Sequence, residues 1–169
     1  DGQRSKIEGG LGNDTIYGGS KDDLLRGGSG DDVIFGKDGD DDIRGGTGDD
    51  LIYGGIGNDR MAGSGGVDTA DYSDIVINGV FVTVAGLDAN LSARRAVHSS
   101  TNKALAWNDR LFNIENVTGT QRNDRFVGSR QDNVFDGQGE VGRSDRQTTF
   151  TDAKGKTYQV TADVVEYQG

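Results

Sequence analysis

Residues 27–35 read GGSGDDVIF, and residues 45–53 read GGTGDDLIY. The same nine-residue frame extends outward from these two blocks in both directions. The other blocks are GGLGNDTIY (9–17), GGSKDDLLR (18–26), GKDGDDDIR (36–44), GGIGNDRMA (54–62) and GSGGVDTAD (63–71). A short repeat of this kind indicates an array in which each unit buries its apolar residues against its neighbours.

Two positions of the frame keep one chemical character in all blocks. The sixth position is aspartate at Asp14, Asp23, Asp32, Asp41, Asp50, Asp59 and Asp68. The eighth position is apolar at Ile16, Leu25, Ile34, Ile43, Ile52, Met61 and Ala70. A disordered acidic linker would not keep an apolar residue at a fixed phase, so the pattern indicates a folded array.

The charge of the chain is concentrated in these blocks. The 169 residues carry a net charge of −10, and residues 9–71, with 14 Asp, no Glu and 5 Lys or Arg, account for −9 of it. An acid-rich segment without a polybasic patch argues against nucleic acid and anionic membranes as partners, and it favours a cation. The chain has no cysteine, which excludes disulfides and thiolate metal sites. It also has no apolar run that could span a bilayer, so we expect no membrane insertion.

The frame predicts its own local structure. Glycine favours turns at positions one to six, and positions seven to nine suit a short strand whose middle side chain points inward. Two blocks would make one coil of 18 residues, and coils would stack at about 4.8 Å, the usual strand spacing. The predicted fold class is therefore all-β: a parallel β-roll, or β-solenoid, with a β-rich capping and linker segment. Aspartates one coil apart would form columns that repel unless a divalent cation lies between them.

Calcium fits such columns best. Ca²⁺ accepts six to eight oxygens in flexible geometry, from carboxylates and from the backbone carbonyls that glycine turns expose. No His/Cys cluster is present to prefer zinc. Mg²⁺ demands stricter octahedral geometry and keeps its waters.

The blocks resemble the hemolysin-type calcium-binding repeat of the RTX family of parallel β-rolls, closely over residues 9–71 and more loosely over 72–145. The resemblance implies that each ion lies between two blocks one coil apart. The earlier block would give the carbonyls of its second and fourth residues, the later block those of its first and third, and both would give the sixth-position aspartate.

Carried over by position, the resemblance implies about five Ca²⁺ sites, which would add about ten positive charges to the chain. The first two sites would comprise Gly10, Gly12, Asp14, Gly27, Ser29 and Asp32, and then Gly19, Lys21, Asp23, Gly36, Asp38 and Asp41. The next two would comprise Gly28, Gly30, Asp32, Gly45, Thr47 and Asp50, and then Lys37, Gly39, Asp41, Gly54, Ile56 and Asp59. The fifth would comprise Gly46, Gly48, Asp50, Gly63, Gly65 and Asp68.

Three positions depart from the pattern. Lys21 replaces glycine at the fourth place and Lys37 replaces it at the second, so we expect weaker sites there. Residues 1–8 keep the phase, with Ile7 at the apolar place, but Ser5 stands where the aspartate should be. We expect that coil to be an edge without a full site of its own.

The metal should be needed for folding. One buried apolar side chain per block contributes roughly 2–3 kcal/mol, whereas ordering nine residues costs on the order of 10 kcal/mol or more. We therefore expect a largely disordered calcium-free chain and a rigid calcium-bound roll.

The resemblance implies a module of a larger secreted protein, either a toxin, an adhesin or an exoenzyme, that leaves a Gram-negative bacterium by type I secretion. Because the sequence starts at Asp1, we interpret it as a fragment of that protein. We expect a monomer whose partners are Ca²⁺ and other domains of the parent. We expect no enzyme activity, because the aspartate pairs repeat in block after block whereas an active site is single. The alternative is a module that recognises a polysaccharide or another surface.

The two faces of the predicted roll differ. Outward positions of the odd blocks include Tyr17, Phe35 and Tyr53, which form a predicted aromatic ladder, whereas those of the even blocks are mixed and charged. Our hypothesis is that the ladder is covered, either by the segment after residue 72 or by another part of the parent. An accessible ladder would favour the recognition alternative.

Residues 72–145 are expected to form a capping and linker segment with degenerate repeats, which docks on the roll and covers its open edge. The frame returns in GTQRNDRFV (119–127) and GSRQDNVFD (128–136), with Asp124 as a further candidate calcium ligand. Residues 146–169 predict a hairpin, interpreted as the start of a next domain. We expect His98 in a loop after Val97, and Trp107 in core or capping packing.

Overall fold

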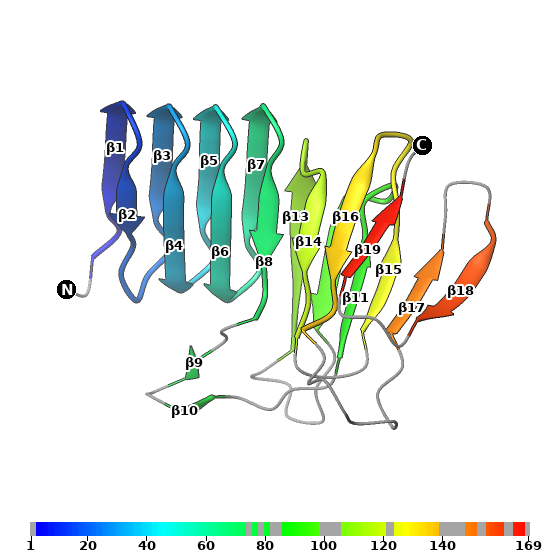
Figure 1. Ribbon diagram of the computed structural model, residues 1–169. Coiled ribbons are helices and arrows are strands. Elements are labelled where there is room, and N and C mark those ends of the chain that lie inside the picture. The colour runs from blue at the N-terminus through cyan, green and yellow to red at the C-terminus, as the bar shows by residue number, and fades with distance from the viewer. Residues whose placement is uncertain are drawn as a thin grey trace.

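A computed structural model of the chain describes residues 3–73, 76–77, 80–81, 86–98, 106–120, 124–138, 148–151, 155–160 and 164–167. Every regular element in these ranges is a β-strand, which confirms the all-β prediction. Figure 1 shows the strands as two layers along one axis. A ten-stranded sheet has the order β1-β3-β5-β7-β13-β12-β11-β15-β17-β18, and a seven-stranded sheet has the order β19-β16-β14-β8-β6-β4-β2.

The predicted parallel β-roll is confirmed in the first part of the chain. Its strands in the ten-stranded sheet are β1 (Lys6–Leu11), β3 (Leu24–Ser29), β5 (Asp42–Thr47) and β7 (Arg60–Gly65). Its strands in the seven-stranded sheet are β2 (Thr15–Tyr17), β4 (Val33–Asp38), β6 (Leu51–Ile56) and β8 (Thr69–Asp71). All neighbours in the roll are parallel, and each residue pairs with the one 18 positions later, as Leu25 pairs with Ile43.

The eighth-position residues fill the space between the two sheets. Leu25, Ile34, Ile43 and Ile52 are completely buried, and Ile16 in the outermost complete coil is 4% exposed. The rows of these residues run along the axis, so each coil buries its apolar side chains against the coil on either side. This packing explains why the apolar phase stays fixed when the other positions vary.

Most roll strands are longer than predicted. Six of the eight have six residues, because pairing continues from positions seven to nine into the first three residues of the next block, as in the pair Gly28–Gly46. The expectation that positions one to six are all turn was wrong in this respect. Stacked turns of like shape keep their backbone groups in register, so the ladder of hydrogen bonds runs on into the turn.

The chain after residue 72 extends the same two sheets. β13 (Trp107–Phe112) pairs in parallel with β7, and β14 (Asn116–Thr118) pairs in parallel with β8. The expected covering of the open edges of the roll at β7 and β8 is thus observed. The pair β9 (Val76–Ile77) and β10 (Val80–Phe81) is antiparallel and separate from both sheets.

An antiparallel insertion then interrupts the parallel order. β11 (Leu87–Asn90) and β12 (Arg95–His98) lie between β13 and β15 (Arg125–Val127), while β16 (Asn133–Asp136) follows β14 directly in the other sheet. Figure 1 shows β13 to β16 continuing the line of the first coils.

Both strands of the predicted C-terminal hairpin are present. β17 (Thr148–Thr151) pairs antiparallel with β18 (Thr157–Val160), and β19 (Val164–Tyr167) pairs antiparallel with β16. Residues 152–154, between β17 and β18, lie outside the described residues. The proposed boundaries at residues 71 and 145 remain predictions. No helix in the described part of the chain is long and apolar enough to cross a membrane.

Candidate calcium sites

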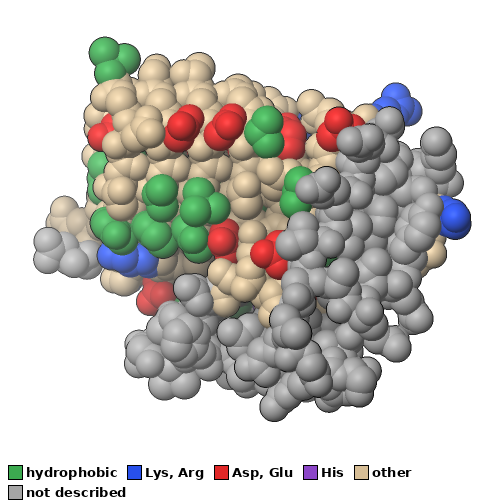
Figure 2. All heavy atoms as spheres, in the orientation of Figure 1, with side chains coloured by type: hydrophobic (Ala, Val, Ile, Leu, Met, Phe, Trp, Pro, Cys, Tyr) green, Lys and Arg blue, Asp and Glu red, His purple; other side chains and the backbone are tan. Residues whose placement is uncertain are grey.

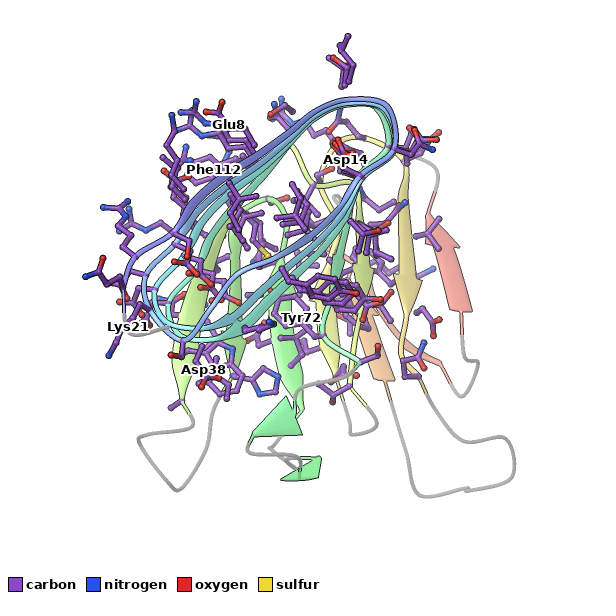
Figure 3. The ribbon with its side chains drawn as sticks, turned by 90° about the vertical axis from the view of Figure 1, so that its left-hand side faces the viewer. Glu8, Asp14, Lys21, Asp38, Tyr72 and Phe112 are labelled. Atoms are coloured by element: carbon purple, nitrogen blue, oxygen red, sulfur yellow. The ribbon has the colours of Figure 1, made fainter. Side chains whose placement is uncertain are left out.

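The sixth-position aspartates form two columns inside the turns of the roll. Figure 3 looks along the axis and shows Asp14 at one turn, with Lys21 and Asp38 at the opposite turn. One column holds Asp14, Asp32, Asp50 and Asp68, and the other holds Asp23, Asp41 and Asp59. All except Asp14 are 0–2% exposed.

One carboxylate oxygen of each buried aspartate is fixed by the coil before it. The N–H of Asp14 donates to Oδ1 of Asp32 at 2.8 Å, and the N–H of Asp32 donates to Oδ1 of Asp50 at 2.9 Å. The other column repeats this bond, for example from the N–H of Asp41 to Oδ1 of Asp59 at 2.9 Å. The bonds hold each side chain in one orientation along the axis.

The second oxygen of nearly every column aspartate has no hydrogen-bond donor. These buried Oδ2 atoms belong to Asp14, Asp32, Asp41, Asp50, Asp59 and Asp68. A buried carboxylate oxygen without a partner is costly, and its usual compensation is a cation. The columns therefore fit the predicted divalent ion on the geometry of the protein alone.

Burial also disfavours the charge of these groups. It raises the pKa of Asp41 from its ordinary value of 3.8 to about 7, that of Asp50 to about 6 and that of Asp68 to about 7. Burial and the nearby Asp109 raise the pKa of Asp59 to about 8. In each case the neighbouring carboxylates of the column add to the effect. A bound cation would reverse this balance.

Backbone carbonyls lie next to the unpartnered oxygens. A Cβ atom placed on Gly9 would lie against Oδ2 of Asp14 and 2.7 Å from the carbonyl O of Gly27, one coil later. The same juxtaposition recurs in the other column, where a Cβ on Gly36 would meet Oδ2 of Asp41 and the carbonyl O of Gly54. Each such point has a carboxylate and a carbonyl from adjacent coils, which is the donor set that Ca²⁺ prefers.

The two lysine substitutions have different consequences. Lys37 adopts φ 80, close to the left-handed geometry of its counterparts Gly46 and Gly55, so its turn is preserved. Lys21 has no such φ, although its counterparts Gly12, Gly30, Gly39 and Gly48 all do. In the turn of Lys21, the N–H of Gly19 donates to Oδ2 of Asp23 at 2.6 Å, and β2 ends at Tyr17. The predicted site of Gly19, Lys21 and Asp23 therefore departs in geometry from the others.

Both columns end on acidic residues that the nonapeptide frame did not identify. The N–H of Asp59 donates to Oδ1 of Asp109 at 2.9 Å, and the N–H of Asp68 donates to Oε2 of Glu115 at 3.1 Å. At the other end, the N–H of Ser5 donates to Oδ1 of Asp23, and β1 is the first strand of its sheet, so this coil lies at the edge; its lack of a full site stays a prediction. Asp109 has a signal in the sequence: Asn-Asp-Arg-Leu (108–111) repeats Asn-Asp-Arg-Met (58–61). Its offset of 50 residues is not a multiple of nine, and a strict frame misses it.

Asp109 differs from the other column members because a side chain takes up its second oxygen. The hydroxyl of Tyr72 donates to Oδ2 of Asp109 at 2.9 Å, and both residues are buried. Asp124 is also satisfied by the protein: its Oδ2 accepts the N–H of Thr120 and its Oδ1 accepts the N–H of Leu87. The structure gives no support to a calcium ion at Asp124.

A second ladder follows the fifth position of the blocks, on the outside of the turns. The N–H of Asp31 donates to Oδ1 of Asn13, and the N–H of Asp49 donates to Oδ1 of Asp31 at 2.9 Å. On the opposite turns the N–H of Asp40 donates to Oδ1 of Asp22. These exposed side chains link successive turns by hydrogen bonds, which accounts for the restriction of this position to Asn and Asp in most blocks.

His98 and Trp107 pack in the core of the second half. His98 lies in β12 and is 1% exposed, so the expectation of a loop position was wrong. Its ring lies 4.8 Å from the ring of Trp107, centroid to centroid, and burial lowers its pKa to about 4. A neutral imidazole in an apolar cluster is a packing residue here. Trp107 is 4% exposed, as predicted for a core residue.

The aromatic ladder is at the surface of the seven-stranded sheet. Figure 2 shows hydrophobic side chains together on this face, over the first coils of the roll. Tyr17 is 56% exposed, and Phe35 and Tyr53 are partly buried. Their rings stack on one another at centroid distances of 4.9 and 4.5 Å. Because most ring faces are occupied by neighbouring rings, the ladder gives little support to sugar stacking, and its covering by the parent protein remains a hypothesis.

A family model for the RTX calcium-binding nonapeptide repeat matches the chain at residues 8–43, 35–70 and 117–139, in four copies. Together these matches cover more than half of the chain, and the protein therefore belongs to this family. The third match includes residues 119–136, where the frame returns after the insertion. The chain matches no curated protein.

RTX repeats are calcium-binding modules of secreted proteins, and they are typical of Gram-negative bacteria. Among the described residues, no group of three or more His, Cys, Asp or Glu side chains could hold a metal ion.

Proposed function

We propose that this module folds when it meets calcium outside the cell, and that this folding serves the secretion and stability of a larger secreted protein. The observation that carries the proposal is the pair of buried columns in which six Oδ2 atoms lack any donor. Such columns oppose folding while they are bare and favour it once divalent ions lie between the coils.

The ligand sets are part of the proposal. About five Ca²⁺ ions would lie between successive coils, three along Asp14, Asp32, Asp50 and Asp68 and two along Asp23, Asp41 and Asp59. The carbonyls of the intervening turns would complete each site. The altered turn at Lys21 supports a weaker site between Asp23 and Asp41 than elsewhere.

The proposed route of export rests on the same dependence of folding on calcium. A chain that stays unfolded where calcium is scarce can be threaded through an export channel, and it becomes rigid where calcium is plentiful. We infer export by type I secretion from a Gram-negative bacterium, with the module acting as a monomer attached to other domains of its parent.

Far-UV circular dichroism during a calcium titration tests the proposal, with magnesium as the matched control. We expect a cooperative gain of β signal with calcium and little change with magnesium, because Mg²⁺ holds its waters and requires octahedral geometry. Full β structure in a chelator at neutral pH would contradict the proposal, since the core would then fold without the ions.

A further inference from the structure

Three arginines lie side by side on the solvent face of the ten-stranded sheet. Arg60 of β7 pairs in register with Arg110 of β13, which pairs in register with Arg95 of β12. Arg95 and Arg110 are exposed, and Arg60 is half-buried. We call these three residues the arginine row.

The arginine row lacks the compensating charge that other arginines of this sheet have. Arg26 pairs with Glu8 at 3.2 Å, and Arg125 pairs with Asp88 at 2.9 Å. In the row, only Arg60 has a carboxylate partner, Asp42 at 3.0 Å. Among the described residues, no carboxylate pairs with Arg95 or Arg110, and no acidic side chain points to solvent from β7, β12 or β13.

Like charges opposite each other on adjacent strands destabilise a sheet. This protein carries a net charge of −10, yet it gathers positive charge at one place, where among the described residues Asp42 compensates Arg60 alone. A local field opposite in sign to that of the whole molecule is the usual mark of a surface that meets a charged partner.

The neighbouring ring of Phe112 extends the positive surface. The guanidinium carbon of Arg60 lies 4.6 Å from the ring centroid, and that of Arg94 lies 5.8 Å from it. Figure 3 shows Phe112 on the same outer side of the coils as Glu8. Because guanidinium groups cover this ring, it cannot serve as a stacking platform for nucleic acid bases.

A polar hollow adjoins this surface at Arg94. It has a volume of about 540 Å³, and Arg94, Arg130, Ser92 and Gln131 are among the residues that line it. It lies beside residues 113–115, which connect Phe112 to Asn116, whereas six residues connect Ala62 and Thr69, the positions paired with them in the roll. None of the described residues that line it is acidic. Arginine, hydroxyl and amide groups around a concave space suit a sugar ring that carries an acidic group.

We propose that the arginine row and the adjoining hollow bind an acidic polysaccharide. Adjacent arginines are separated by the strand spacing of about 4.8 Å, which is comparable to the length of one sugar unit, so a linear chain running across the strands can present one acidic group to each guanidinium. The planar guanidinium binds carboxylate or sulfate with two parallel hydrogen bonds. This inference is independent of the calcium proposal, except that the calcium-bound roll holds β7 in place.

The test measures binding of the calcium-loaded chain to a short oligogalacturonate and to dextran sulfate by isothermal titration calorimetry, with neutral dextran as the uncharged control. We expect binding to at least one anionic glycan and none to neutral dextran. The two anionic probes distinguish carboxylate from sulfate recognition. Affinity should fall steeply when the salt concentration rises about tenfold, because the interaction is between exposed charges.

Matched variants locate the surface. The double variant R95Q/R110Q should bind at least about tenfold more weakly, since it removes two guanidinium forks. The double variant R26Q/R44Q makes the same change of charge on the same sheet, at two arginines that already pair with Glu8 and Asp42, and should bind like the original chain. Circular dichroism with calcium should show that both variants are folded.

Three results would overturn the proposal. The first is no binding of either anionic glycan at low salt. The second is an equal loss in R26Q/R44Q, which would indicate unspecific charge attraction. The third is tighter binding to duplex DNA or to phosphatidylglycerol vesicles than to the glycans, which would assign the surface to another class of partner.

Discussion

At the scale of single residues, the two oxygens of a column aspartate have separate tasks. Oδ1 accepts the N–H of the coil before it, and Oδ2 of six of these aspartates has no donor in the part of the chain that the structure describes. Asn133 shows the consequence by contrast. At the same position of the frame, its Oδ1 accepts the N–H of Ser129 and its Nδ2 donates to the carbonyl O of Glu115, both at 2.8 Å. An amide there satisfies the protein without an ion, whereas six of the column carboxylates keep a buried Oδ2 without a donor among the described residues.

The substitution Asp50→Asn should therefore weaken calcium binding without harming the calcium-free chain. Asp50 belongs to two successive proposed Ca²⁺ sites of its column, one shared with Asp32 and one shared with Asp68. A hydrogen bond or ligand contact to a charged group is worth ~1.5–3 kcal/mol, so the calcium midpoint should rise about tenfold or more. Circular dichroism titration gives the midpoint.

Asp49→Asn is the matched control for this change. Asp49 is exposed, its Oδ1 accepts the N–H of Val67 at 2.8 Å, and an asparagine can accept the same bond. Asn13 and Asn58 already occupy this position in other blocks. Equal shifts of the midpoint in the two variants would show that the column carboxylate has no special role.

The glycines of the turn allow the coils to approach one another. Gly46 has φ 134, and a Cβ on it would overlap the carbonyl O of Gly28 and lie 2.8 Å from the carbonyl C. Gly46→Ala should destabilise the calcium-bound roll by more than ~2 kcal/mol, because it adds a backbone clash to an unfavourable φ. Thermal unfolding in excess calcium measures the effect.

Gly65→Ala provides the comparison for Gly46→Ala. Its Cβ would have the carbonyl O of Gly46 as its nearest neighbour at 3.7 Å, in ordinary contact, and its φ is not left-handed. Both variants keep the backbone carbonyl that would bind the ion. A similar loss of stability in the two variants would mean that coil spacing does not depend on glycine at position two.

At the scale of elements, the roll is joined to the second half at Tyr72, which follows the last roll strand, β8. Its hydroxyl donates to Asp109 on β13 of the other sheet. Asp109 in turn accepts the N–H of Asp59, the last aspartate of its column. The chain thus closes this column with a tyrosine hydroxyl, in a place where other coils leave an oxygen for a cation.

Removing that hydroxyl should loosen the joint between the roll and the second half. Tyr72→Phe leaves a buried oxygen of Asp109 without a donor, which costs ~1–3 kcal/mol. The melting temperature in saturating calcium should fall accordingly. Tyr17→Phe, at a tyrosine that is 56% exposed, should change stability by no more than ~0.5 kcal/mol. If the two variants melt alike, the Tyr72–Asp109 bond does not support the joint.

The structure of the repeating elements could be predicted from the sequence, whereas the contacts of the non-repeating elements could not. Strand phase, parallel register and the column aspartates follow from a frame in which every block gives the same answer. Asp109 and Glu115 could not be predicted from that frame, because they reach the columns through an insertion and a shortened turn. His98 was misplaced for a similar reason: its burial depends on Tyr72 and Trp107, which lie far from it in the sequence.

At the scale of the whole molecule, charge and fold depend on each other. The chain carries −10, and about five calcium ions would bring it close to neutrality. After calcium has neutralised the net charge, the two faces of the molecule still differ in chemistry: one sheet carries the aromatic ladder and the other carries the arginine row. The acidic columns thus serve the folding of the module. The arginine row lies beside them, on β7 at the end of the roll and on β13 and β12, which follow β7 in the sheet.

Acid should partly replace calcium in this scheme. Burial raises the pKa of Asp41 and Asp68 to about 7 and that of Asp59 to about 8, whereas the unfolded chain keeps the ordinary value of 3.8. The folded state therefore binds protons more tightly than the unfolded state. As a result, the calcium-free roll gains stability as the pH falls from about 8 towards 3.8, and gains nothing further below that value.

Circular dichroism in a chelator should accordingly show more β structure at about pH 5 than at about pH 8, independent of protein concentration. With calcium present the sign reverses, because protons compete with the ion for the same oxygens, and the calcium midpoint should rise on acidification. Asp50→Asn should reduce both effects, since burial raises the pKa of Asp50 to about 6 and the variant has no proton to bind there. A calcium-free chain that loses structure on acidification would show that the buried columns do not oppose folding, and the reason for the calcium requirement would then have to lie in the glycine-rich turns.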